Sequence, residues 1–324
     1  MTNISLTRRQ TLAGLTATTA LTLGGCATTG GVSRLRQMTI APDEWLDDVA
    51  YRLLEHEPER ATGLGVDTGD YASLRGKLED QSIAGQREYA SSLRWVVGQM
   101  EGLDESGLTP DQQTSFQVVR SAFATAAEGF DLPYGDVAVG SWRNAPYVVI
   151  QNVGTYLDMP RFLDSSQPLA DEADTGYYLD RLTSVDTALD GELERLEKAR
   201  SLGVIPPDFL LDKAIAAMEA SIASAPQDYV KPLEKAPGGG RDAAMATARS
   251  AVESKIVPAL QRQLAELKTE RARATSNAGM WAQPGGEEWY RWALKASTTT
   301  TLSPDEIHEQ GLQELEDLWL SLKN

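Results

Sequence analysis

Apolar side chains recur every three or four residues along most of the chain, which is the period of an amphipathic helix. Over 43–57, for example, tryptophan, leucine and valine residues fall on one helical face. The same period predicts further helices over 83–100, 110–128, 171–202, 207–224, 241–274, 281–295 and 304–322. We therefore expect a mainly α fold, arranged as a multi-helix array.

Capping residues mark where two of these helices begin. Thr109 precedes Pro110, and a proline at the first position of a helix costs no hydrogen bond. Ser303 stands three residues before Glu306, which is the spacing of a capping box. Inside the predicted helix over 241–274, Pro258 is expected to cause a kink, because proline lacks the amide hydrogen that a helix interior needs.

The stretch around 131–163 differs from the rest, because glycine and proline punctuate it at short intervals. Two short runs of β-branched and aromatic residues, 137–139 and 147–150, are the places where we expect strands. The sequence thus predicts a short irregular, β-containing segment within a helical protein. A long turn-rich stretch of this kind often carries function.

The amino terminus has the pattern of a bacterial export signal. Arg8 and Arg9 precede a weakly apolar run over 12–23, which is too short to span a bilayer. A paired arginine before such a run is typical of a twin-arginine signal. The run ends in leucine and two glycines directly before Cys26, which fits a lipobox in which the cysteine thiol receives a lipid.

These features predict how the chain is divided. Residues 1–25 are expected to be a twin-arginine and lipoprotein signal peptide, 26–40 a lipidated tether, and 41–324 a helical domain. Alanine rather than aspartate follows Cys26, which favours sorting to the outer membrane. We expect a protein exported by the twin-arginine route and anchored by lipid at the periplasmic face of the membrane.

Charge and the rare residue types exclude several kinds of chemistry. The chain has 30 lysines and arginines against 47 acidic residues, a net charge of −17, so nucleic acid is excluded as a partner. A single cysteine excludes an intramolecular disulfide. Its two histidines, His56 and His308, lie far apart, and neither begins the H-E-x-x-H motif of a zinc protease. No catalytic or metal-binding residue is therefore assigned.

Three local clusters have structural interpretations. The acidic pairs Glu57/Glu59 and Glu287/Glu288 are interpreted as solvated helix faces. The aromatic cluster over 281–292 is interpreted as core, with a groove wall for peptide side chains as the alternative.

Several motifs, in order along the chain, resemble those of the bacterial family called domain of unknown function 885. They are Gln151–Tyr156 with Pro160–Leu163, Tyr178–Leu182, Gly203–Phe209, Gly285–Tyr290 and Thr298–Leu312. The resemblance extends over about 43–320. One departure is Ser297, since many members have a histidine just before the threonine run.

The resemblance implies a zincin-like metallopeptidase group with a largely helical fold and a long substrate groove. In full-size members the zinc-binding helix lies in a carboxyl-terminal half, after the segment that His308 matches. We therefore expect this chain to be the amino-terminal, incomplete half of a larger zincin-like helical fold. It would then hold no zinc and would be catalytically inactive, whereas zinc is expected in full-length members.

Four residues of the irregular segment and the helix after it are candidates for the substrate groove: Gln151, Asn152, Tyr156 and Arg161. Their amides and phenol would hold the backbone of a peptide, and a purely structural turn is the alternative. The expected partners are the membrane, through the lipid anchor, and peptides. The alternative function is that of a metal-independent, envelope-anchored helical binding protein.

Overall fold

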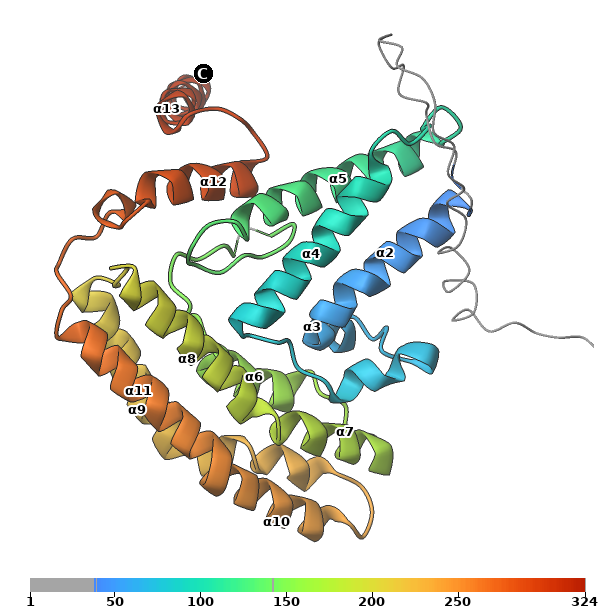
Figure 1. The fold of residues 1–324 in the computed structure, drawn as a ribbon, viewed down its shortest axis with the longest axis vertical. Coiled ribbons are helices and arrows are strands. Elements are labelled where there is room, and N and C mark those ends of the chain that lie inside the picture. Colours follow the sequence, from blue (N-terminus) through green and yellow to red (C-terminus); the bar gives the residue numbers. More distant parts are fainter. Residues whose placement is uncertain (1–37, 39, 142, 324) are drawn as a thin grey trace, which may run out of the picture. The chain divides into compact units, whose positions relative to one another are not determined.

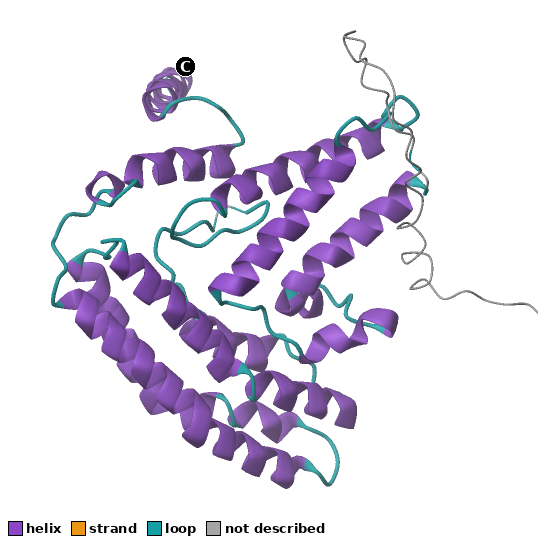
Figure 2. Ribbon diagram, in the orientation of Figure 1, coloured by secondary structure: helices purple, strands orange, loops and turns teal. Residues whose placement is uncertain are grey.

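The computed structural model describes residues 38, 40–141 and 143–323. Within these residues helices predominate and no β-strand is present, as Figure 2 shows. The prediction of a mainly α fold is confirmed. None of the described helices is both long enough and apolar enough to cross a membrane.

Figure 1 labels the α-helices in chain order. They are α2 (Pro42–His56), α3 (Pro58–Gly63), α4 (Ile83–Met100), α5 (Pro110–Gly129), α6 (Thr155–Ser165), α7 (Glu172–Leu182), α8 (Val185–Ser201), α9 (Asp208–Asp228), α10 (Arg241–Ala251), α11 (Val257–Arg271), α12 (Gly286–Thr298) and α13 (Pro304–Ser321). Shorter turns of helix are η2 (Gly69–Gly76), η3 (Lys231–Lys235), η4 (Val252–Ile256) and η5 (Met280–Ala282).

The predicted caps are confirmed, one long predicted helix is divided, and another contains a π-helical turn. Thr109 and Ser303 both form capping boxes. The helix expected over 171–202 is divided into α7 and α8 by a turn at residues 183–184.

The helix expected over 241–274 continues through η4, a π-helical turn that lies directly before Pro258. A proline ring clashes with the carbonyl four residues earlier, and a π turn widens the helix at that point. The distortion that Pro258 was expected to cause is therefore present as a wider turn.

Two hydrophobic clusters hold most of the helices together. The larger one joins α6 to α11, with Leu189, Met218 and Leu260 buried at its centre. Within it α9 and α11 run side by side, as Figure 1 shows. The smaller one joins α2, α4 and α5 around Leu93 and Phe116. The helices of these two clusters bury the apolar faces that their sequence periods predict.

The aromatic cluster over 281–292 is divided between core and surface. Trp289 and Trp292 are buried, and the indole N–H of Trp292 donates to the Thr125 carbonyl of α5 at 2.8 Å. Trp281 and Tyr290 are exposed, with Trp281 77% accessible. The prediction that this aromatic cluster belongs to the core is therefore confirmed for Trp289 and Trp292 only.

The strands expected at 137–139 and 147–150 were a wrong prediction. The described part of 131–163 contains only two isolated β-bridges before α6, Asp136 with Ala145 and Ile150 with Val153. Residues 147–149 are all buried, so they do not alternate between a buried and a solvated face as a half-buried strand would. Their apolar side chains reflect contact with the helices and not pairing in a sheet.

Candidate functional site

The irregular segment, α3, α6, α8 and residues 79–81 together line a pocket of about 440 Å³. Its wall contains six carboxyl side chains against two guanidinium groups. The carboxyl groups belong to Glu57, Glu59, Glu79, Asp136, Asp158 and Glu192, and the guanidinium groups to Arg60 and Arg143. The pocket is therefore acidic, and Met159, Phe162 and several smaller apolar residues complete it.

The acids of the α2–α3 junction are held by neighbouring donors. The Tyr89 hydroxyl donates to one Glu57 oxygen at 2.6 Å, and Arg60 donates to the other at 2.8 Å. Both oxygens of Glu59 accept from the backbone N–H of Glu79 at 3.2 Å. These bonds orient the two carboxylates at the pocket wall. The interpretation of Glu57 and Glu59 as solvated faces was therefore wrong.

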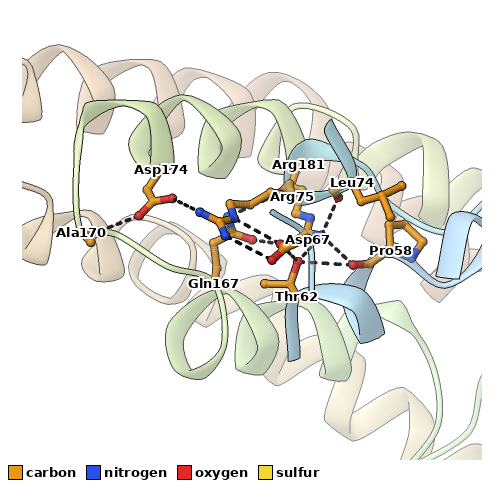
Figure 3. A network of polar contacts seen from close by, with 9 residues as sticks. All are labelled: Pro58, Thr62, Asp67, Leu74, Arg75, Gln167, Ala170, Asp174 and Arg181. Atoms are coloured by element: carbon orange, nitrogen blue, oxygen red, sulfur yellow. Dashed lines mark hydrogen bonds and ion pairs between the residues drawn. The ribbon is translucent and has the colours of Figure 1, made fainter. Parts of the chain in front are cut away.

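Helix α3 is fixed in place by a buried arginine of α7 (Figure 3). The Arg181 guanidinium donates to the carbonyl oxygens of Pro58 at 3.0 Å and Leu74 at 2.9 Å, and to the Thr62 hydroxyl at 2.8 Å. It also donates to Gln167. Because Arg181 is fully buried, these bonds join α3 and η2 to α7 and so set the position of the acids beside Pro58.

A second arginine extends this network, as Figure 3 also shows. Arg75 of η2 donates to Asp67 at 3.2 Å and to Asp174 of α7 at 2.9 Å. Burial works against ionisation of Asp67, but hydrogen bonds from Arg75 and Thr62 prevail and lower its pKa. The network is thus a structural clamp that joins η2 to α7 and favours the charged form of Asp67.

Glu192 of α8 lies at the N-terminus of α6. One of its oxygens accepts from the backbone N–H of Thr155 at 2.7 Å and from the hydroxyl of the same residue at 2.8 Å. The other oxygen accepts from the Gln263 amide at 2.9 Å. Burial outweighs these donors and raises the pKa of Glu192 to about 7. Its charge can therefore change near neutral pH.

Glu79 is the least compensated acid of the pocket. Burial, followed by the negative charges of Glu59 and Asp136, raises its pKa well above the usual range. Arg195 opposes this shift, but its guanidinium already donates to Asp136 at 2.6 Å and to Gln81 at 3.1 Å. Among the described residues, none donates a hydrogen bond to the Glu79 carboxyl group. That group is consequently able to accept one from a ligand.

The predicted groove residues lie beside this pocket and do not form its wall. Tyr156 is buried, and its hydroxyl donates to the Ile150 carbonyl at 2.9 Å. Asn152 and Arg161 are exposed, and Gln151 is half-buried. Their neighbours in the same stretch, among them Val153, Thr155, Asp158 and Phe162, do line the pocket. The structure thus places the expected segment at the site with different side chains turned inward.

Other predicted residues lie away from the pocket or outside the described chain. Arg8, Arg9 and Cys26 lie outside the described residues. His308 is exposed on α13, and the half-buried His56 stacks on Tyr89 with 4.7 Å between ring centres. In the part of the chain that the structure describes, no three His, Cys, Asp or Glu side chains are placed to hold a metal ion.

Two comparisons with known proteins gave matches. The family described as "Bacterial protein of unknown function (DUF885)" matches residues 58–320. A solved structure described as "the putative lipoprotein from Colwellia psychrerythraea" is similar with a TM-score of 0.76 and 22% identity over 86% of this chain. The match covers 50% of that chain, so the present chain spans about half of its length. No curated protein matches.

Proposed function

Because this chain belongs to the bacterial DUF885 family, we propose that it is an envelope-associated helical protein whose acidic pocket binds a cationic group, such as the amine of a peptide. One observation carries the proposal, namely that six carboxyl groups and two guanidinium groups line the same cavity. A peptide is the proposed carrier of the cation, in keeping with the groove expected from the sequence.

Desolvation gives the physical reason for this ligand class. Removing a carboxylate from water is unfavourable unless a positive partner compensates. In the free protein the pocket meets that cost by raising the pKa values of Glu79 and Glu192. An ammonium group has three donors and one positive charge, so it supplies both the hydrogen bonds and the charge that these acids lack.

The first experiment compares two tripeptides in calorimetric titrations of the purified protein. In Ala-Lys-Ala the central side chain carries an amine, and in Ala-norleucine-Ala it is a neutral chain of similar shape, with both peptides acetylated and amidated. We expect at least about tenfold tighter binding of the lysine peptide, as for a charge-assisted hydrogen bond. Equal affinities would contradict the proposal.

A variant locates the binding in the pocket. Glu79→Gln keeps the shape of the side chain and removes its charge, and we expect it to weaken the lysine peptide about tenfold while leaving the norleucine peptide unchanged. Glu253→Gln is the matched control, because Glu253 is exposed and does not line the pocket. If both variants bind like the unchanged protein, the cation is bound elsewhere.

Export and lipid anchoring remain part of the proposal. The description of the Colwellia protein as a lipoprotein supports them for a chain with the sequence features around Arg8, Arg9 and Cys26. We expect Cys26→Ala to move the protein from the membrane fraction to the soluble periplasmic fraction. Replacing Arg8 and Arg9 with lysine should retain it in the cytoplasm. A membrane-bound Cys26→Ala protein would exclude the lipid anchor at this residue.

The relation to zinc metallopeptidases is likewise a proposal. In it, this chain supplies the substrate-binding wall, and zinc chemistry belongs to a longer polypeptide such as full-length family members. The purified chain is then expected to hold no stoichiometric zinc and to cleave no peptide. The alternative, a metal-independent binding protein, uses the same pocket. Metal analysis that finds one zinc ion per chain would overturn both.

A further inference from the structure

Helix α13 carries an apolar stripe that no other part of the described chain covers. No residue of this helix is buried, and the exposed fractions of the stripe run from 47% to 81%. Its members follow one another at spacings of three and four residues and so share one helical face. They are Leu312, Leu315, Leu318, Trp319 and, just past the helix, Leu322.

The helix is formed by local interactions rather than by packing. The Ser303 hydroxyl accepts from the backbone N–H of Glu306, and the Glu306 carboxylate accepts from the Ser303 N–H at 2.7 Å. This capping box and Pro304 fix the first turn. The stripe is therefore displayed on an exposed amphipathic helix, which is the arrangement of a helix that inserts into a groove.

The charge on α13 distinguishes between the possible partners. Six acidic residues and no lysine or arginine lie within Pro304–Ser321. At 100° per residue, Glu316 borders one side of the stripe and Glu314 borders the other. Lys323, just past the helix, is the one basic residue beside the stripe, and its ammonium group lies 4.9 Å from the centre of the Trp319 ring. Two copies of this helix, or this helix and an anionic bilayer, would bring like charges together.

From this we infer that α13 docks into a polypeptide partner whose apolar groove is edged by lysine and arginine side chains. The acidic borders then pair with the basic edges while the stripe is removed from water. In the solved Colwellia protein half of the chain lies outside the match, so that relative contains further polypeptide able to supply such a surface. The inference does not depend on the acidic pocket.

The test uses the full chain with Cys26→Ala, so that a lipid cannot bind vesicles in place of the helix. The first probe is a synthetic amphipathic helix with leucine at heptad positions a and d and lysine at e and g. The second has glutamate at e and g, and the third is a vesicle of phosphatidylglycerol. We expect the lysine probe alone to bind, with an affinity that falls as salt is added.

Variants on opposite faces of α13 assign the binding to the stripe. Leu315→Asp is expected to weaken the lysine probe at least about tenfold, because the stripe loses its central contact. Gln313→Asp adds the same charge on the opposite face and should bind as well as the parent chain. Circular dichroism checks that both variants keep the helix.

Other outcomes would overturn the inference. If the lysine and glutamate peptides bind equally well, charge does not select the partner. If the lysine peptide does not bind, the partner does not have a groove edged by basic side chains. A dimer that Leu315→Asp dissociates in sedimentation experiments would assign the stripe to a second copy. Binding of vesicles that Leu315→Asp abolishes would assign it to the membrane.

Discussion

Arg181 is the central donor of the clamp that holds α3, and replacing it with methionine tests how much that clamp contributes to stability. The change keeps the volume of the side chain nearly constant and removes every hydrogen bond of the guanidinium. Arg181 donates to the backbone carbonyl of Lys77 at 2.7 Å and to the side-chain oxygen of Gln167. These bonds add to those with Pro58, Thr62 and Leu74.

The size of the stability loss depends on which hydrogen-bond acceptors lose their only donor when Arg181 is replaced. The Leu74 carbonyl still accepts from the Lys77 N–H at 3.1 Å. The Pro58 carbonyl lies in the first turn of α3, where the helix supplies its own backbone N–H donor. Among the described residues, no other donor contacts the side-chain oxygen of Gln167 or the carbonyl of Lys77. An unsatisfied buried acceptor such as that of Gln167 costs about 1–3 kcal/mol, whereas the carbonyl of the exposed Lys77 loses only a net hydrogen bond of about 0.5–1.5 kcal/mol. Arg181→Met should therefore lower the free energy of unfolding by about 1.5–4.5 kcal/mol.

Urea unfolding followed by circular dichroism measures this loss as a shift of the midpoint at constant slope. Arg262→Met is the matched control, because Arg262 forms an exposed pair with Asp190 at 2.7 Å. An exposed pair contributes about 1 kcal/mol or less. If Arg181→Met costs no more than Arg262→Met, the clamp does not stabilise the fold in the way described.

Two further predictions concern packing and pH. A Cβ added at Gly129 would lie 2.0 Å from the Trp292 ring. We therefore expect Gly129→Ala to lower the free energy of unfolding by about 1–3 kcal/mol, as measured by thermal unfolding. Gly98→Ala is the control, because Gly98 has open space around it, and this change should be neutral or stabilising. Burial raises the pKa of Glu270 to about 8. The folded protein therefore keeps a proton that the unfolded chain releases. Because of this difference, the free energy of unfolding should fall as the pH rises from about 5 to about 8. Glu270→Gln should remove this loss, on the order of 3 kcal/mol at pH 8, and an unchanged pH profile would show that Glu270 ionises normally.

The fold could be predicted from the sequence as far as local rules decide it. Helical period identified most helices, and the caps at Thr109 and Ser303 are local features. The break between α7 and α8 was missed, because the apolar period continues across it. The apolar run 147–150 suggested a strand. A short segment buried among helices has the same run of apolar residues as a strand buried in a sheet, so the sequence alone does not distinguish the two.

The candidate site could be predicted only as a region. The expected segment around Tyr156 does reach the pocket, yet its inward side chains are Thr155 and Asp158. The acids come from five separate parts of the chain, and sequence spacing does not show that Glu79 and Glu192 converge. A weak signal was present in Glu57 and Glu59, which flank a proline that begins a short helix.

Proton release on binding tests the acidic pocket most directly. Burial raises the pKa of Glu192 to about 7 and also raises the pKa of Glu79, so these carboxyl groups bind protons more strongly than free ones do. A bound ammonium group should lower both pKa values. Titration of the acetylated, amidated Ala-Lys-Ala peptide at pH 7, in two buffers with different ionisation enthalpies, gives the number of protons released. We predict a net release of protons when the peptide binds, and a smaller release in Glu79→Gln. Binding without proton release, or no binding, would contradict the assignment of this pocket as a cation site.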